Sequence, residues 1–430
     1  MTPATSRPSS YRWLVFAVLA AAYLLVYFHR TCPAVVAADL MRDLGAGATA
    51  MGMLGAAYFY PYALMQLPAG LLSDSWGPRK TITLFFALAG VGAIWLGLAG
   101  SIGPAIAART LVGLGVAMVF VPTMKVLTHW FKREEFAGMM GVLMALGGVG
   151  AYTAAQPLAW LSVAIGWRGS FILIGAATLL LAGVIWVVVR NRPEEKGLPP
   201  VPDPVGDPPG SQDITLGQGM KMVLGNGRFW AVAVWFFFTP GIFFALGGLW
   251  GGPYLMQVYG MSKTQAGGML SMLAVGMIIG SPLLSWISDK VLVSRKKMLV
   301  ITSGGLLVLL AILYLNPGGL SLGMLYAWFF LFSVCSSAIV VVAFTTTKEL
   351  FPVAIAGTST GLVNLFPFLG GAILQPVSGW LLSIQGGPRG PYDAAMYAKV
   401  FLFYLACIVV AFVAACLTRE TMPGRKAKAA

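Results

Sequence analysis

The sequence predicts an all-α polytopic membrane protein in which twelve transmembrane helices form two six-helix bundles. Three observations lead to this fold class: the composition, twelve separate apolar runs, and a loop pattern that recurs half a chain later. Of the 430 residues, 58% are hydrophobic and 10% are charged, and the mean hydropathy is +0.83. Soluble domains carry about 25% charged residues, so most of this chain must be surrounded by hydrocarbon.

Twelve apolar runs have the length of a membrane span. A helix rises about 1.5 Å per residue, so about 20 residues cross the roughly 30 Å hydrocarbon layer. The predicted spans are 13–36, 48–72, 81–100, 103–125, 136–160, 168–189, 229–258, 265–287, 298–316, 320–346, 353–384 and 395–418. Because their number is even, both termini are expected on the same side of the membrane.

The distribution of positive charge predicts which side that is. With cytoplasmic termini, twenty of the Lys and Arg residues outside the spans lie on the cytoplasmic side of the membrane. Five lie on the opposite side, namely Arg42, Arg168, Lys263, Arg389 and Lys399. Cytoplasmic loops of membrane proteins are enriched in such residues, so both termini are expected in the cytoplasm. The net charge of +14 comes from short clusters between apolar runs, without a continuous basic stripe, so no nucleic-acid partner is expected.

One long polar segment divides the chain into two parts. It lies between Arg190 and Arg228 and contains Pro193, Pro199, Pro200, Pro202, Pro204, Pro208 and Pro209. A proline-rich segment of low apolar content is typical of an extended linker. The predicted domains are therefore a bundle at 12–190, a cytoplasmic linker at 191–227 and a second bundle at 228–420.

The two parts share a loop pattern. In the loops after the second and eighth spans, an Asp (Asp74, Asp289) closes one helix and a basic cluster opens the next. These two residues are 289 − 74 = 215 positions apart, which is half of the chain. A duplicated six-helix unit explains this spacing.

Several motifs together resemble the major facilitator superfamily. They are the loop from Gly70 to Lys80, Arg109 with Gly113 and Gly115, Trp130-Phe131, the segment from Arg192 to Gly197, and Glu349 to Pro352 with Gly357 and Gly361. The segment after Arg192 and the Lys125 that precedes Trp130 are most similar to bacterial members that carry organic anions or phosphorylated organics. The resemblance implies the major facilitator fold, alternating access and a functional monomer. The fifth span has Gly147, Gly150 and Gln156-Pro157, which departs from the signature of drug–proton antiporters.

An ionisable group inside a membrane helix is costly, which makes Arg30 the first candidate for substrate binding. Tyr23 and Tyr27 precede it at helical spacing, so the three side chains share one face, and Pro33 can bend the helix just beyond. A guanidinium flanked by tyrosines could hold a carboxylate or phosphate bidentately. The alternative is a structural arginine near the outer end of the span, paired with Asp39.

Proton coupling has few candidates. None of the fourteen acidic residues lies in the middle of a span, and Asp39 and Asp393 lie near outer ends. Such a cavity should be electropositive and favour anions. If a proton is carried, His29, Asp39 or the substrate would carry it. The alternative for His29 is a packing residue, which is the more common role of such a histidine.

Charged residues at the cytoplasmic helix ends suit a gate. The candidates are Asp74, Arg79, Lys80, Asp289 and Arg295, since a carboxylate facing basic residues can latch two bundles and release them. The alternative is that these charges only fix the topology. The resemblance adds Arg109, which in that family lies near helix interfaces that rearrange; it could instead be a buried structural arginine.

Uncharged polar and aromatic residues complete the predicted cavity. They are Tyr62 and Gln66 in the second span, Trp250 in the seventh, and Asn364 and Gln375 in the eleventh. The seventh span is interrupted by Thr239-Pro240-Gly241 and several glycines, and broken helices often line transport sites.

Taken together, the residues predict a secondary active transporter of a small organic anion, which we expect to be a carboxylate. Transport would be proton-coupled or by exchange, in a bacterial inner membrane. The alternative is an exporter of amphipathic drugs or siderophores, in which Arg30 is structural. No enzyme activity, metal site or cofactor is expected, because the sequence has no cluster of His, Asp, Glu or Cys within a span.

Overall fold

The computed structural model describes residues 10–201, 216–352, 355–387 and 390–422. Several residues used above lie outside this part of the chain: Arg389, Pro202, Pro204, Pro208 and Pro209, and, among the twenty cytoplasmic Lys and Arg, Arg7, Arg425, Lys426 and Lys428. The fold is built from helices, as the composition predicts.

The N-terminal half contains α1 to α9. Their bounds are α1 (Tyr11–Thr31), α2 (Pro33–Asp43), α3 (Ala48–Leu64), α4 (Gln66–Ser75), α5 (Pro78–Leu98), α6 (Ile102–Ala117), α7 (Phe120–Trp130), α8 (Arg133–Thr153) and α9 (Gln156–Val188). The C-terminal half contains α11 (Gly227–Ile242), η2 (Phe243–Trp250), α12 (Gly251–Val258), α13 (Lys263–Trp286), η3 (Ile287–Val291), α14 (Arg295–Leu315), α15 (Leu322–Ser333), η4 (Val334–Ala338), α16 (Val340–Glu349), α17 (Ala356–Val363), α18 (Leu365–Gly386) and α19 (Ala394–Leu417).

In the part of the chain that the structure describes, consecutive helices combine into twelve passages through the molecule. Ten helical stretches of the described chain are long and apolar enough to cross a membrane. One of them, Arg133–Val188, is 56 residues long and reverses at Gly166, whose φ of 73° breaks α9, so it contains two passages. The pair α3 and α4, broken at Met65, supplies the remaining passage.

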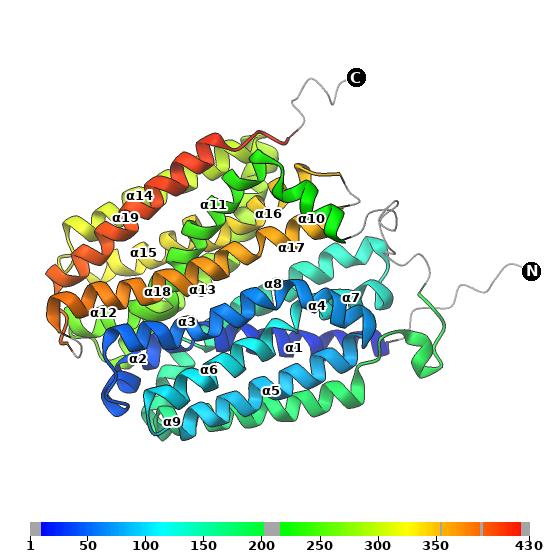
Figure 1. The fold of residues 1–430 in the computed structure, drawn as a ribbon, viewed down its shortest axis with the longest axis horizontal. Helices are drawn as coiled ribbons and strands as arrows, with labels where there is room; N and C mark the ends of the chain where they lie inside the picture. The colour runs from blue at the N-terminus through cyan, green and yellow to red at the C-terminus, as the bar shows by residue number, and fades with distance from the viewer. Residues whose placement is uncertain (1–9, 202–215, 353–354, 388–389, 423–430) are drawn as a thin grey trace, which may run out of the picture.

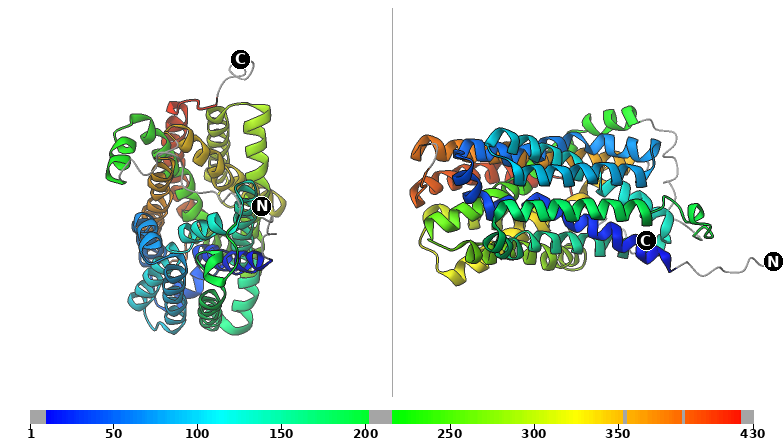
Figure 2. Two further views of the ribbon diagram at one scale, coloured as in Figure 1. Left: turned by 90° about the vertical axis from the view of Figure 1, so that its right-hand side faces the viewer. Right: turned by 90° about the horizontal axis from the view of Figure 1, so that it is seen from below.

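The two halves lie side by side with their helices roughly parallel (Figure 1). The N-terminal half, blue through cyan to the green of α9, occupies the lower part of that view. The C-terminal half, green through yellow to red, occupies the upper part, and the left view of Figure 2 shows the same division. Across the boundary, α3 packs on α18, α2 on α12 and α8 on α13. We call the end of the molecule where α1 begins and α19 finishes the terminal end, and the opposite end the distal end.

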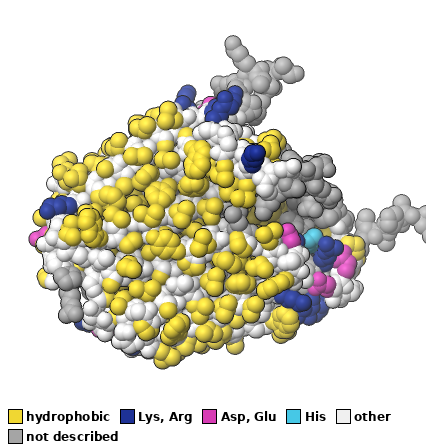
Figure 3. Space-filling view, viewed as in Figure 1, with side chains coloured by type: hydrophobic (Ala, Val, Ile, Leu, Met, Phe, Trp, Pro, Cys, Tyr) yellow, Lys and Arg dark blue, Asp and Glu magenta, His cyan; other side chains and the backbone are white. Residues whose placement is uncertain are grey.

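The outer surface is that of a protein in lipid. Hydrophobic side chains cover the face shown in Figure 3, while charged side chains gather near its ends. Large apolar residues such as Leu64, Leu180, Leu315 and Leu417 are more than 70% exposed. A continuous apolar surface of this kind requires hydrocarbon around it.

The polar segment between the halves is partly helical where it is described. It contains η1 (Pro193–Lys196) and α10 (Leu216–Leu224), whereas the proline content predicted an extended chain. Pro193 fits the first position of a helical turn, where its missing N–H is not needed. The domain boundaries at 12–190, 191–227 and 228–420 stay predictions.

Candidate functional site

The break between α1 and α2 positions the candidate anion-binding arginine. Pro33 has no N–H, so the carbonyl of His29, four residues earlier, lacks its usual backbone hydrogen bond. Arg109 of α6 supplies the missing donor, because its Nη1 donates to the His29 carbonyl oxygen over 2.9 Å. Arg109 thereby stabilises the broken helix beside Arg30.

Arg30 lies in a cage of aromatic rings. Only 6% of its surface is exposed, and its Nη2 donates to the Tyr62 hydroxyl over 2.9 Å. The guanidinium carbon is 4.4 Å from the centre of the Tyr27 ring and 5.0 Å from that of Tyr62. It is 5.0 Å from the Phe368 ring and 5.8 Å from the Phe244 ring. Because the phenylalanines belong to the C-terminal half, Arg30 lies at the boundary between the halves.

No carboxylate balances this charge. Within the described chain, the ion pairs closer than 4.0 Å include neither Arg30 nor Arg109. The Nε of Arg30 also has no hydrogen-bond acceptor among the described residues. Buried charges in proteins are normally paired, so a buried, unpaired guanidinium with a free donor is suited to an anionic ligand.

The predicted amides bridge the two halves beside this cage. Asn364 donates through Nδ2 to Gln66 Oε1 over 2.8 Å, and Gln66 Nε2 donates to the Tyr62 carbonyl over 3.2 Å. Gln375 and Trp250 are almost completely buried; Gln375 Nε2 donates to the carbonyl of Phe244, and Trp250 Nε1 donates to the carbonyl of Gln375. In this conformation they pack α18 on the π-helical segment η2, and their contact with a substrate stays a prediction.

The structure separates the other α1 residues. Tyr23 is 5.3 Å from Tyr27 between ring centres, and its hydroxyl donates to Met144 of α8. His29 points away from the cage, with its Nε2 3.2 Å from the Thr178 hydroxyl. It is fully buried, and its role in proton coupling stays a prediction.

Asp39 joins the two halves at the distal end. It forms an ion pair with Lys263, the first residue of α13, and a second with Arg42 over 3.2 Å. The sequence suggested Arg30 as an alternative partner, but Arg30 is absent from the ion pairs of the described residues. Asp39 therefore connects the halves instead of neutralising the cage.

The predicted gate residues of the N-terminal half pair within that half. Asp74 forms its ion pair with Lys125 of α7, not with Arg79 or Lys80. Arg79 donates to the Trp186 carbonyl at 2.9 Å and lies over the Trp186 ring at 4.1 Å. Lys80 makes no ion pair in the described part of the chain.

The C-terminal gate residues behave in the same way. Arg295 forms an ion pair with Asp289 and a second, at 3.4 Å, with Glu349. All three residues belong to the C-terminal half. In this conformation, none of these charges latches one half to the other.

Sequence analysis missed four residues of this region: Tyr58, Phe244, Phe368 and Lys263. Phe368 follows Asn364 by four positions and so shares its helical face, which was an available signal. Phe244 follows the Pro240 interruption that marked the seventh span. For Lys263 the sequence gave no indication of its partner, because the pairing depends on how the two halves meet.

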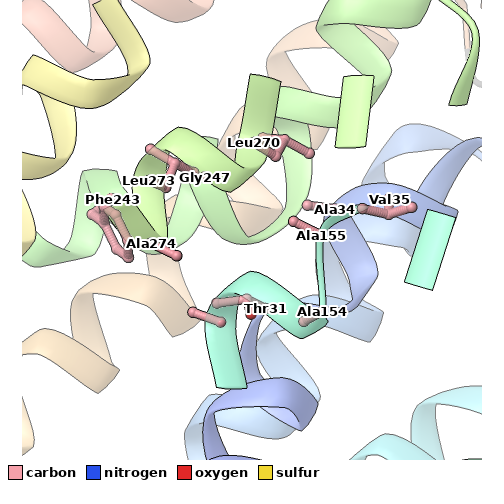
Figure 4. A pocket seen from close by; sticks show the side chains of 11 residues that line it. Thr31, Ala34, Val35, Ala154, Ala155, Phe243, Gly247, Leu270, Leu273 and Ala274 are labelled. Atoms are coloured by element: carbon pink, nitrogen blue, oxygen red, sulfur yellow. The ribbon is translucent and has the colours of Figure 1, made fainter. Parts of the chain in front are cut away.

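A small apolar pocket lies between the halves, and Thr31, the residue after Arg30, is part of its lining (Figure 4). It encloses about 310 Å³, its open mouth included. Its lining consists of Thr31, Ala34, Val35, Ala151, Ala154, Ala155, Phe243, Gly247, Leu270, Leu273 and Ala274. The pocket shows that the packing between α1, α8, η2 and α13 is incomplete near Arg30.

Comparisons with known proteins agree with this architecture. The D-galactonate transporter of Escherichia coli O6:H1 is 24% identical, with 94% of this chain and 97% of that protein covered. The hexuronate transporter of Escherichia coli (strain K12) is 25% identical, with 87% and 88% covered. A crystal structure of a bacterial homologue of the human lysosomal transporter Spinster superposes with a TM-score of 0.73 at 18% identity, covering 95% of this chain and 96% of the other.

The family model of the Major Facilitator Superfamily matches residues 19–375 and 252–430, which is nearly the whole chain. The predicted major facilitator fold is thereby confirmed, and with it the prediction of an integral, multi-pass membrane transporter instead of an enzyme. The chain belongs to the Major Facilitator Superfamily.

Proposed function

We propose that this protein is a secondary active transporter that carries a small organic anion and binds it at Arg30. We expect the anion to be a carboxylate. The observation that carries the proposal is the buried Arg30 guanidinium without a carboxylate partner, at the boundary between the two halves. A carboxylate bound there would complete the hydrogen bonding of the guanidinium and cancel its charge.

The relatives support the same class of substrate. Galactonate and hexuronates are both carboxylates, and the two transporters named for them match this chain over most of its length. Gln66 and Asn364, with free hydrogen-bonding capacity next to Tyr62, would contact polar groups of the bound anion.

Transport would follow from rocking of the two bundles about the site. Phe244 and Phe368 belong to one half and Tyr27 and Tyr62 to the other, so separation of the halves opens the cage. The charge distribution of the loops supports both termini in the cytoplasm. The family resemblance supports a functional monomer in a bacterial inner membrane.

A ligand-stabilisation screen tests the proposal. Purified protein is heated with D-galactonate, D-glucuronate, succinate, glucose 6-phosphate, D-glucose or tetraphenylphosphonium, since a bound ligand raises Tm by mass action. We expect at least one carboxylate to raise Tm of the wild type, and Arg30→Gln to remove that shift. Arg419→Gln, at an exposed site at the terminal end, is the matched control and should respond like the wild type.

Two results would overturn the proposal. One is an anion that stabilises Arg30→Gln as much as the wild type. The other is stabilisation of both proteins by the lipophilic cation alone, which would favour the exporter of amphipathic compounds and make Arg30 structural.

A further inference from the structure

We propose that this transporter is an obligatory exchanger. It changes between its two open states only with an organic anion bound, and no proton is co-transported. One anion entering is balanced by one anion of equal charge leaving. The inference rests on the proposed function, in which Arg30 binds the carboxylate, and adds how the site returns after releasing it.

The N-terminal half contributes two buried positive charges near the boundary with the other half. Arg30 and Arg109 are 6% and 1% exposed. Tyrosines link them, because Arg109 lies over the Tyr58 ring at 4.9 Å and Tyr58 stacks on Tyr62, which accepts the hydrogen bond of Arg30. Among the described residues, no Asp or Glu lies within ion-pair distance of either guanidinium.

The titratable groups facing Arg30 cannot supply a negative charge. They are tyrosines, from α1 (Tyr23, Tyr27) and α3 (Tyr58, Tyr62), while the facing side chains of η2 and α18 are phenylalanines. Tyrosine side chains are neutral near pH 7. His29, on the same helix, would add a positive charge on protonation, beside Arg109.

Two carboxylates at the ends of the spans, Asp39 and Asp74, already have partners among the described residues. Asp39 at the distal end pairs with Lys263 and Arg42, and Asp74 at the terminal end pairs with Lys125. None of the fourteen acidic residues of the sequence lies in the middle of a predicted span. The empty site therefore has no internal anion that could balance Arg30.

This charge balance decides which forms can cross. Between its two open states, the carrier passes through a state closed at both ends, where water is excluded from the cage. If the site were empty, that closed state would enclose two unpaired guanidinium groups. Enclosing unpaired charges in a low dielectric is strongly unfavourable. A bound carboxylate cancels one of these charges. In a proton-coupled carrier, an internal carboxylate would do this when the site is empty, and here that group is lacking.

Counterflow in proteoliposomes tests the inference. Vesicles containing the purified full chain are loaded with buffer alone or with an equimolar mixture of D-galactonate, D-glucuronate, succinate and glucose 6-phosphate. Uptake of each labelled acid is then measured with and without an inward proton gradient. We expect uptake at least tenfold faster into loaded vesicles, and no response to the gradient or to a protonophore.

The outcomes separate the two proposals. Uptake into empty vesicles, driven by the proton gradient at the rate of exchange, would overturn exchange and leave the anion-transport proposal standing. Absence of uptake of all four acids in both conditions would overturn the proposed function, and the exchange inference with it.

A matched pair of variants tests the charge argument itself. Tyr62→Glu places a carboxylate where Arg30 now finds its hydrogen-bond acceptor, and Tyr62→Gln places an uncharged group of the same size there. We expect Tyr62→Glu to allow uptake into empty vesicles under an inward proton gradient, while Tyr62→Gln, if active, requires internal anion. A Tyr62→Glu protein that still exchanges and still requires internal anion would contradict the argument.

Discussion

The distal and terminal ends of the molecule differ in how the two halves meet. At the distal end, Asp39 and Lys263 form an ion pair across the boundary, and the Thr49 hydroxyl lies 3.0 Å from that of Ser383. At the terminal end, each of four ion pairs lies within a single half. Arg12–Glu135 and Asp74–Lys125 lie within the N-terminal half, and Asp289–Arg295 and Arg295–Glu349 lie within the C-terminal half. The described conformation is therefore fastened at the distal end.

Backbone packing shows the same difference. A methyl group on Gly252 of α12 would overlap the carbonyl oxygen of Ala34, and one on Gly379 of α18 would overlap that of Ala48. Such close approach between halves requires glycine. Closure at the distal end therefore uses both helix contact and charge, whereas the terminal charges stabilise each half separately.

The largest effect should come from Gly252→Ala, which would break the distal contact. Because the new methyl group meets backbone and not a flexible side chain, α2 and α12 must move apart. We expect anion transport to fall more than tenfold, measured by counterflow, while a cysteine introduced at Thr49 becomes more reactive to an impermeant maleimide. Gly183→Ala, with open space around the added methyl group, is the control and should transport normally. Normal transport by Gly252→Ala would contradict tight distal closure.

A smaller effect should follow from Asp39→Asn or Lys263→Gln, which remove one partner of the distal ion pair. Both side chains are largely buried, at 11% and 18% exposure, so the remaining charge is left poorly compensated. We expect transport to fall roughly three- to tenfold, since about 1 kcal/mol corresponds to about fivefold. The exchanged pair Asp39→Lys with Lys263→Asp should recover at least half of the activity. If the double variant is no better than the single ones, the pair does not act as a clasp.

The terminal pair Asp74–Lys125 should matter less. The Asp74 side chain is 69% exposed, and exposed ion pairs contribute about 0–1 kcal/mol. We expect Asp74→Asn to retain transport within about threefold of the wild type, measured in the same vesicles. A loss of tenfold or more with unchanged Tm would restore Asp74 to the gating role that its sequence position predicted.

The smallest effect concerns Glu420, which lies beyond α19. Burial would raise the pKa of Glu420, but hydrogen bonds from Ser294 and from the backbone N–H groups of Met422, Arg295 and Thr421 outweigh it and lower the pKa. A lowered folded-state pKa means that stabilisation is complete above the ordinary value of 4.5 and disappears as pH falls through the folded-state pKa.

Glu420→Gln should therefore lower stability slightly at pH 7, by less than about 0.5 kcal/mol because the group is largely exposed to solvent. The difference in Tm from the wild type should shrink as pH falls below about 4.5, which thermal unfolding at several pH values measures. A difference that grows on acidification would contradict the assignment.

Much of the fold could be predicted from the sequence, because span length and charge distribution are local properties. The predicted span 298–316 lies within α14 (Arg295–Leu315) except for its last residue, and 395–418 nearly coincides with α19 (Ala394–Leu417). Pro33 marked the bend that separates α1 from α2. The prediction of an extended linker missed the short helices η1 and α10, because short helices depend on packing against neighbours.

The candidate site was predicted only in part, for a physical reason. Arg30 and Tyr27 share a helical face, so their proximity follows from the helical repeat alone. Phe368 lies 338 positions after Arg30, and its contact depends on the register between α18 and α3. Similarly, Asp74 is close to Arg79 in the sequence but pairs with Lys125, because the fold of the N-terminal half determines the partner.

Calorimetric titration tests the central claim, that Arg30 holds the transported anion, most directly. The panel carboxylate that gives the largest rise in Tm is titrated into the wild type, Arg30→Gln and the control Arg419→Gln. Truncation of one partner of a buried charge pair costs about 2–5 kcal/mol, so Kd should rise at least about 30-fold in Arg30→Gln and stay unchanged in the control. A Kd for Arg30→Gln within threefold of the wild type would contradict the account.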